Sequence, residues 1–187
     1  MNRLDIQATP LAGLLRITSR QLGDERGYLA RMFCQDELQA AGWHGPVAQS
    51  NLTYTRERGT VRGLHFQHPP HAEMKLVRCL RGEVWDVAVD LRRGSPSFLQ
   101  WHAERLSADR FNALLIPEGF AHGFQTLSDE VEMLYLHSAA HAPQSEDGLN
   151  VADPRLAVAW PLPIGTLSAR DHSLPFLTDR FEGIVLP

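Results

Sequence analysis

The stretch EVWDVAVDL, Glu83–Leu91, decides the fold class because polar and apolar side chains alternate along it. Successive residues of a β-strand face opposite sides of the sheet. The odd-numbered positions after Glu83 are all apolar: Trp85, Val87, Val89 and Leu91. The alternation therefore predicts a strand with an apolar packing face.

Similar segments recur on both sides of this stretch, separated by Gly, Pro, Asp and Ser. They span residues 12–19, 28–33, 60–66, 75–80, 98–106, 112–116, 122–127 and 131–138. Many short strands with tight turns predict an all-β protein, an antiparallel sandwich or barrel with room for a small ligand in its mouth.

Helical signals are few. Residues 36–41 predict one short helix, with Asp36 as its N-cap and Gly42 as its stop. After Asp153 the prolines predict irregular chain and short helical turns packed on the outside.

Size and composition limit the function classes. At 187 residues and 21.0 kDa the chain has the size of one domain. The net charge of −4 gives no general argument for nucleic-acid binding. Two cysteines, Cys34 and Cys79, are too few for a zinc site or a disulfide scaffold, and we expect buried thiols. With no signal-like N-terminus and no run of ~20 apolar residues, we expect a cytoplasmic protein without a membrane partner.

The densest polar stretch joins Gln49–Asn51 to Val61–Gln67, and Lys75 opens the next apolar segment. His65 and Lys75 on neighbouring inward-facing strands would place a titratable base beside a fixed cation. That pair suits proton removal next to a carbonyl, since the ammonium can stabilise the enolate oxygen. A core histidine and a lysine that extends to water would explain the same residues without catalysis.

Three further residues can take part in proton transfer. His122 follows the turn Pro117–Gly119, Tyr135 can protonate a carbanion from the face opposite the base, and Asp171 can orient His65. Each also has a structural explanation: a hairpin histidine, a buried tyrosine with a bonded hydroxyl, and a capping box from Ser168 to Asp171.

A metal site is a separate alternative. Pro117-x-Gly119-x-x-His122 matches the second half of the cupin metal signature, but Gln67 stands where the first half has a second histidine. Glutamine is a poor ligand for zinc or iron, and Lys75 would oppose a cation. We expect chemistry without a metal; sensitivity to a chelator would indicate the alternative.

Taken together, the motifs resemble the dTDP-4-dehydrorhamnose 3,5-epimerases over about residues 24–171. They occur in the order and spacing of that family: QSN (49–51), VRGLHFQ (61–67), KLVR (75–78), GEV (82–84), DVAVDLR (86–92), IPEGFAHGF (116–124), WP (160–161) and Ser168-x-x-Asp171.

The resemblance implies a cupin-type jelly roll or β-barrel with short peripheral helices, no metal and no other cofactor. It also implies inversion at C3 and C5 of a nucleoside-diphosphate 4-keto-6-deoxy-glucose, from dTDP-4-dehydro-6-deoxy-D-glucose to dTDP-4-dehydro-L-rhamnose. On this basis residues 1–187 form one epimerase domain and a homodimer. The expected parts are an exchanged N-terminal segment (about 1–35), a barrel core (about 45–140) and a peripheral C-terminal segment (about 150–187).

Residue roles follow from the same resemblance. His65 with Asp171 is the implied base, Tyr135 is the acid, and Lys75 and His122 contact the keto sugar. The residues implied to hold the nucleotide or its diphosphate are Arg26, Gln49, Asn51, Arg62, Glu146 and Arg170.

Three positions depart from the family pattern where the nucleotide base is expected. Leu29 replaces an aromatic residue, Arg31 replaces an acid and His141 replaces a tyrosine. Thymine N3–H is a donor that suits glutamate, whereas cytosine N3 is an acceptor that suits Arg31. We favour dTDP, because thymine O2 and O4 also accept hydrogen bonds. A CDP-linked sugar, inversion at C3 alone and a non-catalytic sugar-nucleotide-binding cupin are the alternatives.

Overall fold

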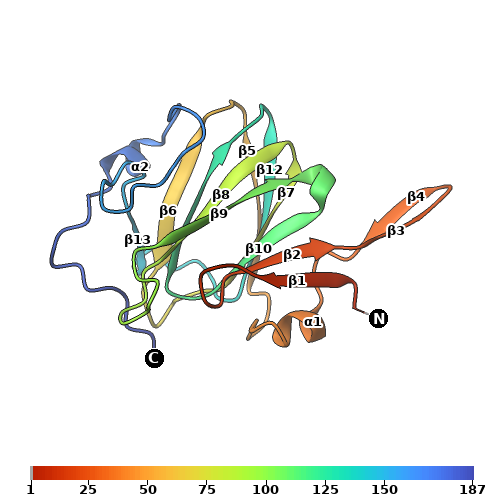
Figure 1. The fold of residues 1–187 in the computed structure, drawn as a ribbon, viewed down its shortest axis with the longest axis horizontal. Helices are drawn as coiled ribbons and strands as arrows, with labels where there is room; N and C mark the ends of the chain where they lie inside the picture. The colour runs from red at the N-terminus through yellow and green to blue at the C-terminus, as the bar shows by residue number, and fades with distance from the viewer. Residues whose placement is uncertain (1) are drawn as a thin grey trace.

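Two antiparallel sheets face each other in the computed structural model, which describes residues 2–187 (Figure 1). In spatial order, the six-stranded sheet contains β1 (Leu4–Ala8), β2 (Leu15–Ser19), β10 (Asn112–Ile116), β7 (Lys75–Arg81), β12 (Val131–His137) and β5 (Gln49–Thr55). The five-stranded sheet contains β13 (Glu146–Gly148), β6 (Val61–Gln67), β11 (Phe120–Thr126), β8 (Glu83–Asp90) and β9 (Trp101–Ser107). The all-β, jelly-roll prediction is confirmed.

Strand β8, which contains the alternating stretch that predicted the fold class, is buried on both faces. Val84 and Ala88 point into the core between the sheets, and Val87 and Val89 point to the outer face of the five-stranded sheet. Full burial of such side chains stabilises the fold by about 1.5–3 kcal/mol each. The inner core draws on both sheets, with Val77 and Met133 from one packing against Phe124 of the other.

The C-terminal segment covers the outer face of the five-stranded sheet. Leu149, Val151, Leu156 and Ile184 are buried there against the outward side chains of β6 and β8. The predicted irregular tail is found, and its one short helix, α2 (Ala169–Ser173), contacts β6. This packing places α2, near the C-terminus of the chain, beside β6 of the five-stranded sheet.

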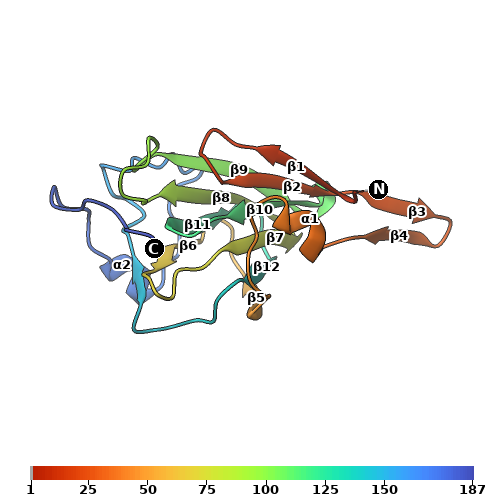
Figure 2. The same ribbon diagram turned by 90° about the horizontal axis from the view of Figure 1, so that it is seen from below.

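A two-stranded hairpin, β3 (Gln21–Asp24) and β4 (Gly27–Ala30), projects away from both sheets (Figure 2). Its apolar side chains Leu22, Tyr28 and Leu29 are exposed. The edge strand β5 also exposes large side chains, Leu52 and Tyr54. Within residues 2–187, no helix has the length and apolar character needed to cross a membrane.

Several predicted strand boundaries are wrong. The segment predicted at 12–19 begins as a strand only at Leu15, because the chain turns at Gly13 with a φ of +85°. The segment 98–106 begins at Trp101, since Leu99 has a φ of +62°, which no β-strand tolerates. The segment 28–33 ends at Ala30, where the chain leaves the hairpin. Strands β1, β3, β5 and β13 were not predicted; QSNLTYT in β5 is too polar to show apolar alternation.

The predicted helix start at Asp36 is also wrong. Helix α1 spans Gln35–Gln39, its N-cap is Cys34, and no side chain caps it. The Glu37 carboxylate instead accepts the backbone N–H groups of Arg3 and Leu4, which ties α1 to β1. The helix ends before Gly42, and Cys34 is half-buried rather than buried, whereas Cys79 is buried as expected.

A bulge in β6 shifts its register against β11. His122 pairs with His65, but Phe124 pairs with Arg62, so β6 contains one extra residue between the two pairs. Because of this extra residue, Arg62 and His65 point to the same side of the sheet, although a regular strand would separate them. Gly63 forms the bulge with a φ of +131° and lies against Gly123.

We predict that Gly63→Ala destabilises the protein more than Gly42→Ala. Both glycines have positive φ, +131° and +99°, and such strain costs about 1–3 kcal/mol in a non-glycine residue. A Cβ at Gly63 would lie 2.5 Å from the Gly123 Cα, whereas a Cβ at Gly42 would meet nothing within 4 Å. Overpacking adds about 1–3 kcal/mol at Gly63 alone. Urea unfolding of both variants measures the difference; equal losses would contradict the close-packing argument.

Candidate active site

A cavity of about 410 Å³ opens between the two sheets at the end where α2 is packed. It is lined by strands of both sheets and by the loop and helix that follow β12. Of the predicted site residues it gathers all but Arg26 and Arg31: His65, Lys75, Tyr135, Asp171, Gln49, Asn51, Arg62, His122, His141, Glu146 and Arg170.

His65 and Asp171 are in direct contact, although they are far apart in sequence. His65 Nε2 lies 2.7 Å from Asp171 Oδ1, and the Gly63 backbone N–H donates to the other carboxylate oxygen at 3.4 Å. Burial by itself raises the pKa of Asp171, but the hydrogen bond and charge of His65 outweigh it and leave the pKa below its usual value. Against an ionised Asp171 the proton of a neutral His65 stays on Nε2, so Nδ1 carries the lone pair.

The capping explanation of Asp171 also holds. The Ser168 hydroxyl accepts the backbone N–H of Asp171 at 3.0 Å and so begins helix α2. This cap fixes the turn from which the Asp171 carboxylate extends to His65. Asp171 therefore belongs to the capping box of α2 and contacts His65 at the same time, so the two interpretations of Asp171 are compatible.

A second imidazole–carboxylate pair lies deeper in the cavity wall. His122 Nε2 lies 2.9 Å from Asp86 Oδ2 and 3.1 Å from Oδ1. Asp86 is fully buried on the inner face of β8, and burial raises its pKa. The pair holds the His122 ring rigidly at the cavity surface.

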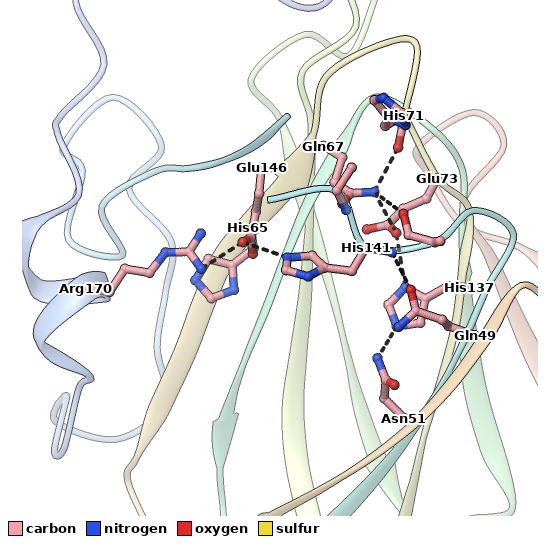
Figure 3. A network of polar contacts seen from close by, with 12 residues as sticks. Gln49, Asn51, His65, Gln67, His71, Glu73, His137, His141, Glu146 and Arg170 are labelled. Carbon is pink, nitrogen blue, oxygen red and sulfur yellow. Dashed lines mark hydrogen bonds and ion pairs between the residues drawn. The ribbon is translucent and has the colours of Figure 1, made fainter. Parts of the chain in front are cut away.

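A third carboxylate, Glu73, accepts hydrogen bonds or ion pairs from three donors, of which Figure 3 labels Gln67 and His137. Its oxygens lie 3.0 Å from Lys75 Nζ, 3.2 Å from His137 Nδ1 and 3.1 Å from Gln67 Nε2. Burial raises the pKa of Glu73, but the hydrogen bond from His137 and the charge of Lys75 outweigh it, and the net pKa is lowered. Since Glu73 only accepts, His137 donates from Nδ1 and turns Nε2 toward the Asn51 amide, 3.4 Å away.

His137 is a cavity residue that the sequence analysis missed. The sequence position of His137 could have indicated this, because a residue two places after Tyr135 lies on the same face of β12. The Tyr135 ring stacks on His137 with centroids 6.1 Å apart and meets His122 edge-on at 6.0 Å. Burial raises the pKa of Tyr135, so the phenol stays protonated at neutral pH.

Two arginines, Arg62 and Arg170, and the imidazole of His141 line the cavity together with Glu146. Arg170 Nη1 and His141 Nε2 both contact Glu146 Oε2, at 2.9 and 3.0 Å (Figure 3). Arg62 donates from Nε to the Thr55 hydroxyl at 3.0 Å. Arginine forks of this kind bind phosphate groups well, so this part of the cavity suits a diphosphate.

Arg26 and Arg31 lie away from the cavity of their own chain. Arg26 is at the tip of the projecting hairpin and pairs with Asp24, whereas Arg31 pairs with Glu37 of α1 at 2.9 Å. The Arg31 guanidinium, for which binding of a cytosine base was the alternative expectation, is therefore already paired with Glu37.

The potential metal ligands do not form a metal site. The Gln67 side-chain oxygen accepts the Ala142 backbone N–H, and His65 and His122 each face a separate aspartate. Across residues 2–187, no three His, Cys, Asp or Glu side chains are grouped to hold a metal ion.

A family model described as dTDP-4-dehydrorhamnose 3,5-epimerase matches residues 8–179. The chain belongs to the dTDP-4-dehydrorhamnose 3,5-epimerase family. The epimerase of this name from Pseudomonas aeruginosa is 44% identical over 160 residues, covering 84% of this chain and 87% of the relative. A dTDP-4-dehydrorhamnose 3-epimerase from Streptomyces niveus is 38% identical over 178 residues, covering 95% and 86%.

A solved epimerase structure of this family superposes closely. The Legionella pneumophila enzyme, crystallised in complex with dTDP-4-keto-L-rhamnose, has a TM-score of 0.90 and 35% identity, covering 98% of this chain and 99% of that one. The chain therefore has the cupin-type jelly-roll fold that the resemblance implied.

We predict that Asp171→Asn lowers the free energy of unfolding in a pH-dependent way. A carboxylate whose pKa is lowered on folding stabilises the native state above its usual pKa of 3.8, and this stabilisation is lost as the pH falls through the lowered value. We expect a loss of about 1.5–3 kcal/mol at pH 7, as for a hydrogen bond to a charged group. The loss should shrink when unfolding is measured at pH 3.

The exposed pair His68–Asp147 provides the matched control. Asp147→Asn should change stability by at most ~1 kcal/mol, as is typical of exposed ion pairs. An Asp171→Asn loss that stays constant from pH 7 to pH 3 would contradict the assignment of the lowered pKa.

Proposed function

We propose that the protein is a cytoplasmic epimerase that works without a cofactor and converts dTDP-4-dehydro-6-deoxy-D-glucose to dTDP-4-dehydro-L-rhamnose. One observation carries the proposal. His65 on the five-stranded sheet, which is paired with Asp171 of α2, and Tyr135 on the six-stranded sheet line the same cavity, which also contains Lys75. Epimerisation needs a base and an acid on opposite faces of one carbon, and this arrangement supplies both.

The chemistry begins at the carbon next to the ketone. The 4-keto group acidifies the hydrogens on C3 and C5, and His65 Nδ1 takes one of them as a proton. Asp171 stabilises the imidazolium that forms, and the Lys75 ammonium stabilises the negative oxygen of the enolate. Tyr135 then gives its proton to the opposite face of the same carbon, which inverts the centre. Exchange with water returns both side chains to their starting states.

Inversion at C3 alone is the second candidate. It is favoured by the similar identity of the relative from Streptomyces niveus, which is named a 3-epimerase. Both candidates use the same base and acid and differ in how the sugar ring is placed.

We further propose a homodimer in which the N-terminal segment of about residues 1–35 is exchanged. The projecting hairpin exposes Tyr28 and Leu29, and the edge strand β5 exposes Leu52 and Tyr54. Exposed strand edges pair readily with another chain. A partner's hairpin added at β5 would bring its Arg26 to the nucleotide end of the cavity, where dTDP rather than CDP is the proposed ligand.

We predict that His65→Asn abolishes proton exchange, whereas Tyr135→Phe impairs inversion more than exchange. The reason is that His65 breaks the C–H bond and Tyr135 acts afterwards. NMR of dTDP-4-keto-6-deoxyglucose in heavy water measures both events. Label at C3 and C5 supports the double epimerase and label at C3 alone the second candidate. No label with the wild-type protein would leave only nucleotide binding and contradict the epimerase.

We predict that Arg26→Ala weakens dTDP binding about tenfold or more, as expected for loss of a charged hydrogen bond of ~1.5–3 kcal/mol. Calorimetry measures the affinity, and Arg93→Ala, which removes another exposed arginine, is the control. Mixing Arg26→Ala with His65→Asn subunits should restore activity, because the mixed dimer would contain one complete site. Unchanged affinity and no restoration would contradict the exchange.

A further inference from the structure

The inward face of β5 carries a continuous row of polar side chains. Gln49, Asn51, Thr53 and Thr55 alternate along the strand, and their pairing partners on β12 point into the interior. A polar row on the inner face of a sheet edge is costly unless each group has a hydrogen-bond partner. The hydrogen-bond partners of these four side chains therefore indicate the role of each one.

Three members of the row hold cavity residues from neighbouring elements. Gln49 and Asn51 reach from β5 into the polar network of the cavity (Figure 3). The contacts are Gln49 Oε1 with the His141 backbone N–H, Asn51 Nδ2 with His137 Nε2, and Thr55 Oγ1 with Arg62 Nε. Each of these contacts fixes a side chain or loop that lines the nucleotide or sugar region.

Thr53 is the exception. Its hydroxyl oxygen is buried and has no hydrogen-bond partner of normal geometry within residues 2–187. Leaving a buried hydroxyl unpaired costs about 1–3 kcal/mol. Thr53 lines the cavity, but its hydroxyl oxygen is shielded from solvent, so a polar group in the cavity wall is its nearest available partner.

The neighbouring polar group is the phenol of Tyr135. Thr53 is paired with Met133, and Tyr135 is paired with Asn51, so Thr53 and Tyr135 are diagonal neighbours on one face. Diagonal neighbours lie within reach when one of them is aromatic. The Tyr135 ring is held between His122 and His137, which limits where its hydroxyl can point. Burial raises the pKa of Tyr135, and the Thr53 hydroxyl and the Arg62 charge act against that rise.

We propose that Thr53 is the positioning residue of the proton donor: its hydroxyl donates a hydrogen bond to the Tyr135 oxygen as Tyr135 gives up its proton. In that step the Tyr135 O–H bond breaks, a C–H bond forms on the sugar, and the negative charge moves to the phenol oxygen. Thr53 keeps its own proton throughout. A buried phenolate is otherwise unfavourable, so the hydrogen bond lowers the barrier to inversion but not to the preceding proton removal by His65.

The inference rests on the proposed epimerase function, and its test separates the two events. Thr53→Val keeps the shape of the side chain and removes the hydroxyl, and Thr53→Ser keeps the hydroxyl. In heavy water we expect Thr53→Val to slow inversion at least tenfold, with label incorporation within threefold of wild type. Thr53→Ser should restore inversion to within threefold. Equal losses in both rates, or no loss in either, would overturn the assignment.

A double variant distinguishes this role of Thr53 from a purely structural effect of the substitution. If Thr53 acts through the phenol, Thr53→Val should have no further effect on inversion in a Tyr135→Phe background, whereas a purely structural effect would be the same in both backgrounds. A wild-type protein that neither labels nor inverts the sugar would refute the epimerase proposal and the role of Thr53 with it. Normal wild-type activity with an unaffected Thr53→Val variant would refute the role of Thr53 alone.

Discussion

The hydrogen bond between His65 and Asp171 joins the five-stranded sheet to the last quarter of the chain, and the candidate site depends on it. It forms only if α2 stays beside β6. Leu167 and Leu177, on either side of α2, pack in the same apolar cluster as Leu149 and Val151 on the outer face of the sheet. A segment with almost no regular structure therefore completes the site. The packing of the tail therefore matters for the proposed chemistry, because it places the Asp171 carboxylate beside His65.

Four imidazole–carboxylate pairs line one cavity. His141–Glu146 lies at its exposed end, with the His141 side chain 51% exposed, and the other three pairs differ in their exposure. The side chain of His122 is 6% exposed and that of His137 is 14% exposed, whereas that of His65 is 28% exposed. A base must meet substrate and exchange its proton with water, so among the three inner pairs the most open one suits that task. The two closed pairs restrain the rings on either side of Tyr135. Burial of their carboxylates is compensated by donors in each case, as buried charges require.

The sequence predicted the fold class and named most of the polar residues that line the cavity, because these residues are chemically distinctive and lie in contiguous motifs. It could not show that a bulge at Gly63 turns Arg62 to the same side as His65, since a bulge leaves no trace in an apolar pattern. Thr53 and His137 were missed for a related reason. Their importance comes from sharing a face with Tyr135, and that requires the register between β5 and β12.

Strand β5 connects these observations, because it is at once an edge strand and one wall of the cavity. Its inward side chains contact groups that line the cavity, while its outward side chains and its free edge are uncovered in residues 2–187. An edge strand is hydrogen-bonded to the sheet on one side only, so its position is less restrained than that of a strand inside the sheet. Any chain that paired with this edge would restrain the whole inward row, including Thr53 and the tyrosine it faces. Assembly and proton donation would then depend on the same seven residues.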